Sequence, residues 1–196
     1  MSAAERDKWD TRYRDGAYET RTHPTALLAE WLPRLPRGRA LDVACGAGRN
    51  ALHLAAHGFA VTAIDISAVA LARGQRTAAE RGLVVEWLCA DLDEAPDSVL
   101  PRSGFDLIVW VRYVHRTLLP CLVARLNVGG VLLCEQHLTT DDTEVAGPTS
   151  DRYRLSPGEL QRATATLSVL HAYEGPVVDP DGRRAALAQF VGRRTG

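Results

Sequence analysis

The feature that most constrains this chain is the junction RALDVACGAGRNALHLAAHG at residues 39–58. An apolar strand pattern passes there through small residues into an amphipathic helix pattern, and a short apolar run is typical of a strand covered on both faces. Comparable apolar runs recur along the chain, separated by helix patterns, at 60–65, 83–91, 105–114 and 129–138. Strands and helices that alternate in this way predict a parallel sheet with helices on both faces.

The end of the chain departs from this alternation. Two strand patterns, 167–175 and 183–194, are joined through a segment in which Asp181-Gly182 is a turn signal. They predict an antiparallel hairpin at one edge of the sheet. The expected fold class is therefore α/β, a doubly wound, mostly parallel seven-stranded sheet that ends in an antiparallel C-terminal hairpin and is Rossmann-like.

Helix signals support the same reading. Ser67 is placed to cap a helix over 68–82, which Gly82 ends. Later in the chain, Ser156 as N-cap, Pro157 at the first helical position and Glu159 predict the start of another helix.

Bulk properties exclude several classes of protein. A chain of 196 residues fits one domain, and its net charge of −1 gives no field that would hold a polyanion nonspecifically. Neither a secretory signal nor a membrane span is expected, because no apolar run has the necessary length. The four cysteines have no CxxC spacing and are expected to be reduced thiols, so we expect a cytoplasmic protein.

The glycine-containing turn at residues 44–48 follows the first strand, so backbone amides there can approach a ligand closely. It lacks the third glycine of a dinucleotide fingerprint, since Asn50 and Ala51 follow, and it lacks the Gly-Lys-Ser/Thr of a P-loop. In parallel sheets of this type, ligands bind outside the carboxyl ends of the strands. The turn therefore indicates a ligand site that matches neither the standard dinucleotide motif nor the standard P-loop phosphate motif.

Aspartates stand at or near three successive strand ends. Asp42 lies in the first strand and can accept from loop amides or, through water, from a ligand ammonium group. Asp65 is placed to bind a ribose diol, with Ile66 against an adenine face, while Asp91 and the Leu92 amide are placed for the exocyclic amino edge. Each aspartate alone could be an ordinary turn residue, but three in register favour a nucleoside site.

The segments LDVACGAGRNALHLA, VTAIDIS, CADLD, FDLIVW and GGVLLCEQ, in that order, resemble the class I S-adenosylmethionine-dependent methyltransferases. The resemblance covers about residues 36–138, and the terminal hairpin also matches that fold. Ala44 stands where the first glycine of the family motif is usual. The resemblance implies S-adenosylmethionine as cofactor, S-adenosylhomocysteine as product, and these cofactor-binding residues: Arg12, Asp42, Ala44, Gly46, Gly48, Asn50, Asp65, Ile66, Asp91, Leu92 and Trp110.

Within the class, KWDTRYRDGAYETRTHPTALLAEWLP and the later YRLSPGEL are similar to the tellurite-resistance and thiopurine-type branch. That similarity implies an N-terminal helix over the cofactor, with Trp9, Arg12, Tyr13 and Tyr18 near the site and Arg12 on the methionyl carboxylate. The alternative is a surface helix packed on the sheet. We expect one domain, 1–196, comprising a helical cover (1–36), a cofactor-binding core (37–138) and a substrate-side loop, helix and hairpin (139–196).

The residues after the fourth strand are placed for the acceptor. Tyr113, His115 and Arg116 are the candidate catalytic residues, as base or substrate orienter, and Arg112 or Arg116 could bind an anionic acceptor. The alternative is that RYVHR only begins a helix. His137 is a weaker candidate.

A short chain favours a small-molecule acceptor over nucleic acid or membrane, and the family resemblance suggests a thiol or a tellurium or selenium oxyanion. No metal site is expected, and monomer and homodimer both remain open. The rivals are a non-catalytic S-adenosylmethionine-binding module, an RNA or protein methyltransferase, and an NAD-dependent oxidoreductase. The oxidoreductase is disfavoured because Lys8 is the sole lysine and cannot easily supply a Tyr-Lys pair.

Overall fold

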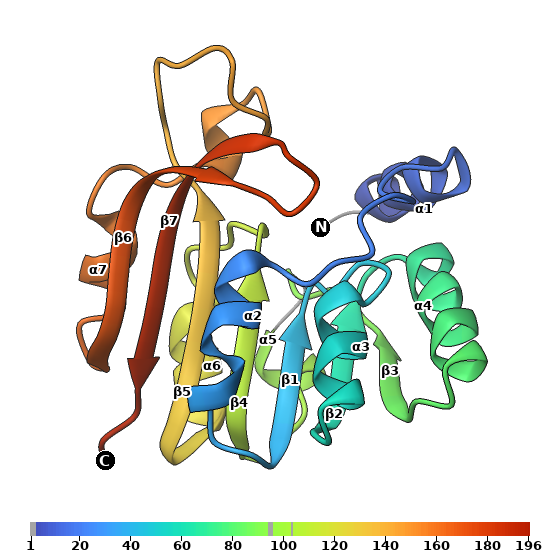
Figure 1. Ribbon diagram of the computed structural model, residues 1–196, viewed down its shortest axis with the longest axis horizontal. Helices are drawn as coiled ribbons and strands as arrows, with labels where there is room; N and C mark the ends of the chain where they lie inside the picture. The colour runs from blue at the N-terminus through green and yellow to red at the C-terminus, as the bar shows by residue number, and fades with distance from the viewer. Residues whose placement is uncertain (1–2, 94–95, 103) are drawn as a thin grey trace.

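The computed structural model describes residues 3–93, 96–102 and 104–196, which fold around one seven-stranded sheet (Figure 1). The strand order is β3-β2-β1-β4-β5-β7-β6. The strands β1 to β5 are mutually parallel, and β7 runs antiparallel to both β5 and β6. Their bounds are β1 Arg39–Val43, β2 Ala60–Asp65, β3 Val85–Cys89, β4 Phe105–Val111, β5 Leu126–His137, β6 Ser168–Val178 and β7 Arg184–Arg193.

Helices cover both faces of this sheet. The α-helices are α1 Ala3–Arg14, α2 Ala26–Trp31, α3 Arg49–Ala56, α4 Ala68–Glu80, α5 Pro96–Val99, α6 Leu119–Arg125 and α7 Glu159–Ala163, and the 3₁₀ turns are η1 Leu32–Arg34 and η2 Asp151–Tyr153. Helices α2 and α3 lie on the near face in Figure 1, with α6 behind the sheet. The predicted α/β fold class with an antiparallel terminal hairpin is confirmed.

Each face of the sheet has its own hydrophobic core, because successive side chains of a strand point to opposite faces. On β4, Leu107 and Val109 pack in the core beneath α2 and α3. Ile108 and Trp110 pack in the other core, with Leu122 of α6. This alternation decides which strand-end residues can reach a ligand on either side.

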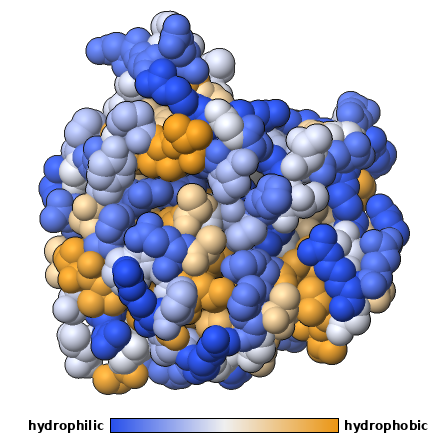
Figure 2. Space-filling view, in the orientation of Figure 1, coloured by the Kyte–Doolittle hydropathy of each residue, from blue (hydrophilic) through white to orange (hydrophobic). Residues whose placement is uncertain are grey.

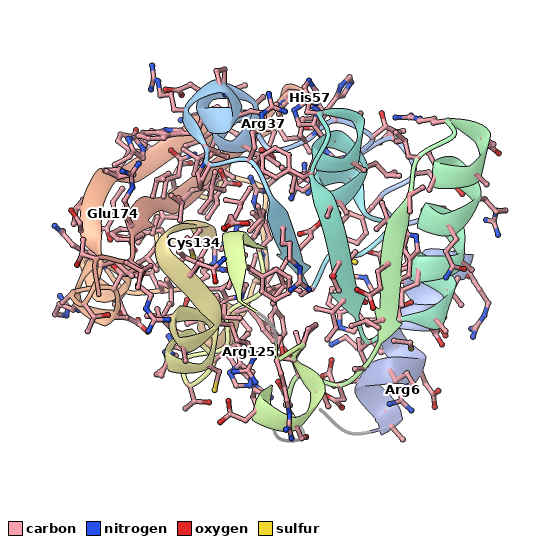
Figure 3. All side chains as sticks on the ribbon, turned by 90° about the horizontal axis from the view of Figure 1, so that it is seen from below. Arg6, Arg37, His57, Arg125, Cys134 and Glu174 are labelled. Atoms are coloured by element: carbon pink, nitrogen blue, oxygen red, sulfur yellow. The ribbon has the colours of Figure 1, made fainter. Side chains whose placement is uncertain are left out.

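The sheet has its topological switch point at β1, which pairs with β2 on one side and β4 on the other. The crossovers from these strands leave in opposite directions, so a crevice opens at their carboxyl ends. At the amino ends of these strands, polar contacts join neighbouring segments instead. Arg37 donates to the carbonyl oxygen of His57, and the two residues lie together in Figure 3. The amide of Arg39 donates to Asp106 Oδ2 at 2.9 Å.

Polar and apolar residues are interspersed over the face shown in Figure 2. Among the described residues, no helix combines the length and the apolar character that crossing a membrane requires. All four cysteines are free thiols, as expected, and Cys134 is buried in the sheet (Figure 3).

One of the two predicted helix starts is confirmed, and the other is wrong. Ser67 caps α4 as predicted, since its Oγ accepts from the amide of Ala70 at 3.1 Å. The expected start of the late helix at Ser156 is wrong, because α7 begins at Glu159 after Gly158, whose φ is +73°. The Glu159 carboxylate still accepts from the Ser156 amide at 2.9 Å, so half of the expected capping box forms around a turn.

Ser67→Ala tests the link between this cap and α1. Besides capping α4, Ser67 Oγ donates to Asp10 Oδ1 of α1 at 2.6 Å. We expect the substitution to lower the free energy of unfolding by about 1 kcal/mol, measured by urea denaturation. Ser168→Ala, at an exposed residue that begins β6, is the control. Equal stability of the two variants would contradict the assigned role of Ser67.

Candidate active site

A cavity of about 620 Å³ lies at the carboxyl ends of the central strands, beneath α1. This size lies within the range of small-molecule and cofactor sites. The turn after β1, the ends of β2 and β4, the segment 147–150 and the N-terminal helix all contribute to its walls. Nine of the predicted site residues line it: Arg12, Asp42, Ala44, Gly46, Asn50, Asp65, Ile66, Leu92 and Tyr113.

The turn between β1 and α3 is held in an unusual backbone conformation. Ala44, Gly46 and Gly48 have φ of +53°, +57° and +77°, so every second residue is left-handed. Such angles suit glycine and strain other residues. Gly46 also borders the Tyr13 side chain so closely that an added Cβ would collide with the Tyr13 hydroxyl.

Asp65 joins the end of β2 to this turn. Its Oδ2 accepts from the Gly46 amide at 2.7 Å, and its Oδ1 accepts from the Ser67 amide at 2.9 Å. Burial raises the pKa of Asp65, while these amide donors oppose that shift. The carboxylate is therefore a fixed part of the cavity wall that holds two strand ends in register.

Asp42 is buried in β1, one strand away. Its Oδ2 accepts from the Ala51 amide of α3 at 2.9 Å. Burial raises the pKa of Asp42 to about 7, and the Ala51 amide and the Arg49 charge oppose the rise. Because its carboxyl group changes charge near neutral pH, any cationic group that binds beside it shifts that equilibrium.

Helix α1 forms the roof of the cavity. Trp9, Arg12, Tyr13 and Tyr18 all line the cavity. Tyr13 is buried, and burial raises the pKa of its hydroxyl. Arg73 of α4 secures the roof by donating to the carbonyl oxygens of Ala17, at 3.0 Å, and of Tyr13.

Tyr113, two residues after the end of β4, also lines the cavity. Its hydroxyl donates to Asp93 Oδ1 at 2.7 Å, and His115 Nε2 lies 3.0 Å from the same oxygen. Burial and the Asp93 carboxylate raise the pKa of Tyr113, so the phenol stays protonated. The Tyr113 hydroxyl is therefore a protonated group that Asp93 holds in one orientation.

Five of the sequence-predicted residues lie outside the lining of this cavity. Gly48 packs against Trp87, and Asp91 Oδ1 accepts from the Asp93 amide at 2.9 Å. Trp110, His115 and Arg116 instead line a smaller cavity of about 100 Å³, to which Leu155 and Leu160 also contribute. Trp110 lies there because β4 turns alternate side chains to opposite faces, and its neighbour Val111 lines the main cavity.

Arginines form the part of the wall that sequence reasoning mostly missed. Arg21, Arg49, Arg112 and Arg183 line the cavity together with His137. Arg112 was considered from its place after β4, and Arg49 directly follows the glycine turn, which was an available signal. The other two come from loops, and no local pattern predicts where those loops fold.

Residues 40–128 match a family model described as a methyltransferase domain. The chain is 32% identical over 118 residues to trans-aconitate 2-methyltransferase from Delftia acidovorans, covering 57% of this chain and 42% of that protein. It is 38% identical over 85 residues to ribosomal RNA small subunit methyltransferase C from Idiomarina loihiensis, covering 43% of this chain and 24% of that protein. The chain thus spans less than half the length of either curated relative.

Among solved structures, TehB from Haemophilus influenzae aligns with a TM-score of 0.72 at 20% identity. The alignment covers 97% of this chain and 67% of that one. At this identity the match concerns the fold, and it includes the N-terminal and C-terminal segments that lie outside the family match.

Gly46→Ala tests whether the turn receives a ligand. We expect the added Cβ to displace the Tyr13 side chain and to weaken S-adenosylhomocysteine binding at least about tenfold, measured by titration calorimetry. Gly58→Ala is the matched control, because Gly58 also has a positive φ of +82° but has open space at its Cβ position. Equal affinity for the two variants would contradict a ligand at the turn.

Asp42→Asn tests the pH dependence of binding. A cationic ligand group beside Asp42 favours the carboxylate, so S-adenosylmethionine binding should release a proton below about pH 7. The affinity of the wild type should rise with pH and level off above that value, whereas Asp42→Asn should lose this component. Calorimetry at about pH 6 in two buffers of different ionisation enthalpy measures the released proton. An identical pH profile in both proteins would rule out this role.

Proposed function

We propose that this chain, which carries a class I S-adenosylmethionine-dependent methyltransferase domain, transfers a methyl group from S-adenosylmethionine to a small-molecule acceptor. The observation that carries the proposal is the bond from the Gly46 amide to Asp65. It makes the glycine turn and the end of β2 one continuous wall of the 620 Å³ cavity.

The residues present fit this cofactor. Ala44 and Gly46 bring backbone to the cavity surface, Asp65 brings a carboxylate suited to a ribose, and Ile66 and Leu92 bring apolar surface suited to a base. Asp42 supplies a second carboxyl group near the turn. We assign the cofactor to this half of the cavity.

Bound S-adenosylmethionine supplies a methyl group on a positively charged sulfur, and an in-line attack by an acceptor lone pair leaves S-adenosylhomocysteine. The protein contributes mainly by holding the acceptor in line with the methyl group and by excluding water. Tyr113, fixed by Asp93, is the orienting hydroxyl on the acceptor side. His115 supports that hydroxyl through the shared Asp93 oxygen rather than by contact with the acceptor.

For the acceptor, the resemblance to the tellurite-resistance and thiopurine-type branch suggests a thiol or a tellurium or selenium oxyanion. These soft nucleophiles need little base catalysis, which agrees with a phenol that stays protonated at Tyr113. The relative named trans-aconitate 2-methyltransferase adds a carboxylic acid to the candidates. The cavity is roofed by α1, which favours such small molecules over a polymer.

Two alternative functions predict different experimental outcomes. The ribosomal RNA relative supports an RNA acceptor, in which case an RNA fragment and not a small molecule should be methylated. A non-catalytic binding module should bind S-adenosylmethionine without turning it over.

Asp65→Asn tests the proposed cofactor site. We expect micromolar binding of S-adenosylmethionine to the wild type, no comparable binding of NAD, and about a tenfold or greater loss in the variant, measured by calorimetry. Asp106→Asn is the matched control, because Asp106 also accepts from a backbone amide but lies at the amino end of the sheet.

Formation of S-adenosylhomocysteine in the presence of thiols, selenite, carboxylic acids or RNA then separates an enzyme from a binding module. Binding of NAD alone would contradict the proposal.

A further inference from the structure

Three arginines line the cavity from three separate segments. Arg21 precedes α2, Arg49 begins α3 and Arg112 follows β4. The three side chains lie close enough for the Arg112 and Arg21 charges to act on Arg49. The Arg49 charge also acts on Asp42, so this group of arginines adjoins the carboxyl groups near the glycine turn.

Arg112 is held rigidly in this position. Its Nε and Nη2 each donate to Glu135 Oε1 at 3.1 Å, and Nη2 donates to Asp179 Oδ1 at 2.7 Å. Gln189 in turn donates to Glu135 Oε2 at 2.8 Å. Arg112 has a left-handed φ of +60°, which this network maintains. The two carboxylates are thus engaged by Arg112.

Arg49 is a partly buried cation with weak compensation. Its Nη1 donates to the His23 carbonyl oxygen at 3.3 Å, and over the described ranges no carboxylate lies within ion-pair distance of its guanidinium. Burial lowers the pKa of Arg49, and the Arg112 and Arg21 charges add to that effect, while the Glu135 and Asp179 carboxylates oppose it. A desolvated cation of this kind gains substantially from an anionic partner.

Arg21 has an ion-pair partner but an unsatisfied hydrogen-bond donor. Its Nε is buried and makes no hydrogen bond to any described residue. The nearest carboxylate oxygen, Asp181 Oδ2, lies 3.4 Å away at an ion-pair distance. The guanidinium stacks on Tyr18, which limits its motion and presents it as a fixed donor.

His137 completes this part of the wall without adding charge. Burial, together with the charges of Arg112, Arg154 and Arg21, lowers the pKa of His137 to about 3, so the imidazole is neutral. Its Nδ1 is buried and makes no hydrogen bond within the described part of the chain. The neutral ring leaves the arginines as the charged groups that face the acceptor here.

We infer that the acceptor carries a carboxylate that Arg21 and Arg49 bind, with Arg112 as a third, fixed cation beside them. The inference rests on the proposed function, whose acceptor it specifies. The planar fork of a guanidinium matches a carboxylate with two parallel hydrogen bonds. Carboxylate binding would supply an ion-pair partner to Arg49 and a hydrogen-bond acceptor to Arg21 Nε, which makes an ion pair with Asp181 but no hydrogen bond.

The test uses trans-aconitate as the carboxylate probe, its trimethyl ester as the neutral match, and selenite as an inorganic oxyanion. Each is titrated calorimetrically into the full chain, with and without saturating S-adenosylhomocysteine. We expect trans-aconitate to bind and the ester not to. Arg21→Gln and Arg49→Gln should each weaken trans-aconitate binding about tenfold or more, and Arg49→Lys should restore part of the loss.

The control is Arg76→Gln, an exposed arginine on α4 outside the cavity lining, which should leave all affinities unchanged. Thermal melts establish that each variant is folded. Binding of selenite without trans-aconitate, or equal binding of the acid and its ester, would overturn the inference. It is also overturned if Arg49→Gln weakens S-adenosylhomocysteine instead, because Arg49 would then serve the cofactor. Binding of trans-aconitate without any S-adenosylhomocysteine binding would refute the proposed function and leave the carboxylate site standing.

Discussion

The buried carboxylate of Asp65 is the contact on which the rest of the site depends. It accepts from Gly46 and Ser67 at once, so it fixes the glycine turn, the end of β2 and the start of α4 relative to one another. Ser67 then extends this connection to α1 through Asp10. A buried carboxylate is costly unless it is hydrogen-bonded, and these two amides donate to both of its oxygens. The roof, the turn and the adjacent strand are therefore organised by one side chain.

The sheet was predictable because its strands are buried on both faces and therefore appear as continuous apolar runs. The same continuity hides which face a given residue takes. Trp110 was expected beside the cofactor, yet it packs in the core with Leu122, and Val111 lines the cavity. A residue's distance from the strand end fixes its face only when the register is known. An error of one residue in the strand register therefore moves a predicted ligand contact into the hydrophobic core.

Elsewhere, features that depend on nearby residues could be predicted from the sequence, and features that depend on the whole fold could not. The Ser67 cap depends on contacts within a few residues and was predicted, whereas Arg21 and Arg183 reach the cavity through loops whose paths depend on the whole fold. The start of α7 lies between these cases. Ser156 and Glu159 do form the expected bond, but Gly158 takes a left-handed angle that delays the helix. The local pairing was correct, and the backbone path through it was not determined by sequence.

Charges of both signs line this one cavity. Aspartates at β1 and β2 and arginines from three segments contribute to its wall, although the whole chain carries a net charge of only −1. The aspartates attract a cofactor that carries a positive sulfur, and the arginines attract an anionic acceptor. Charges of both signs within one cavity can thus hold both reactants without a strong general base.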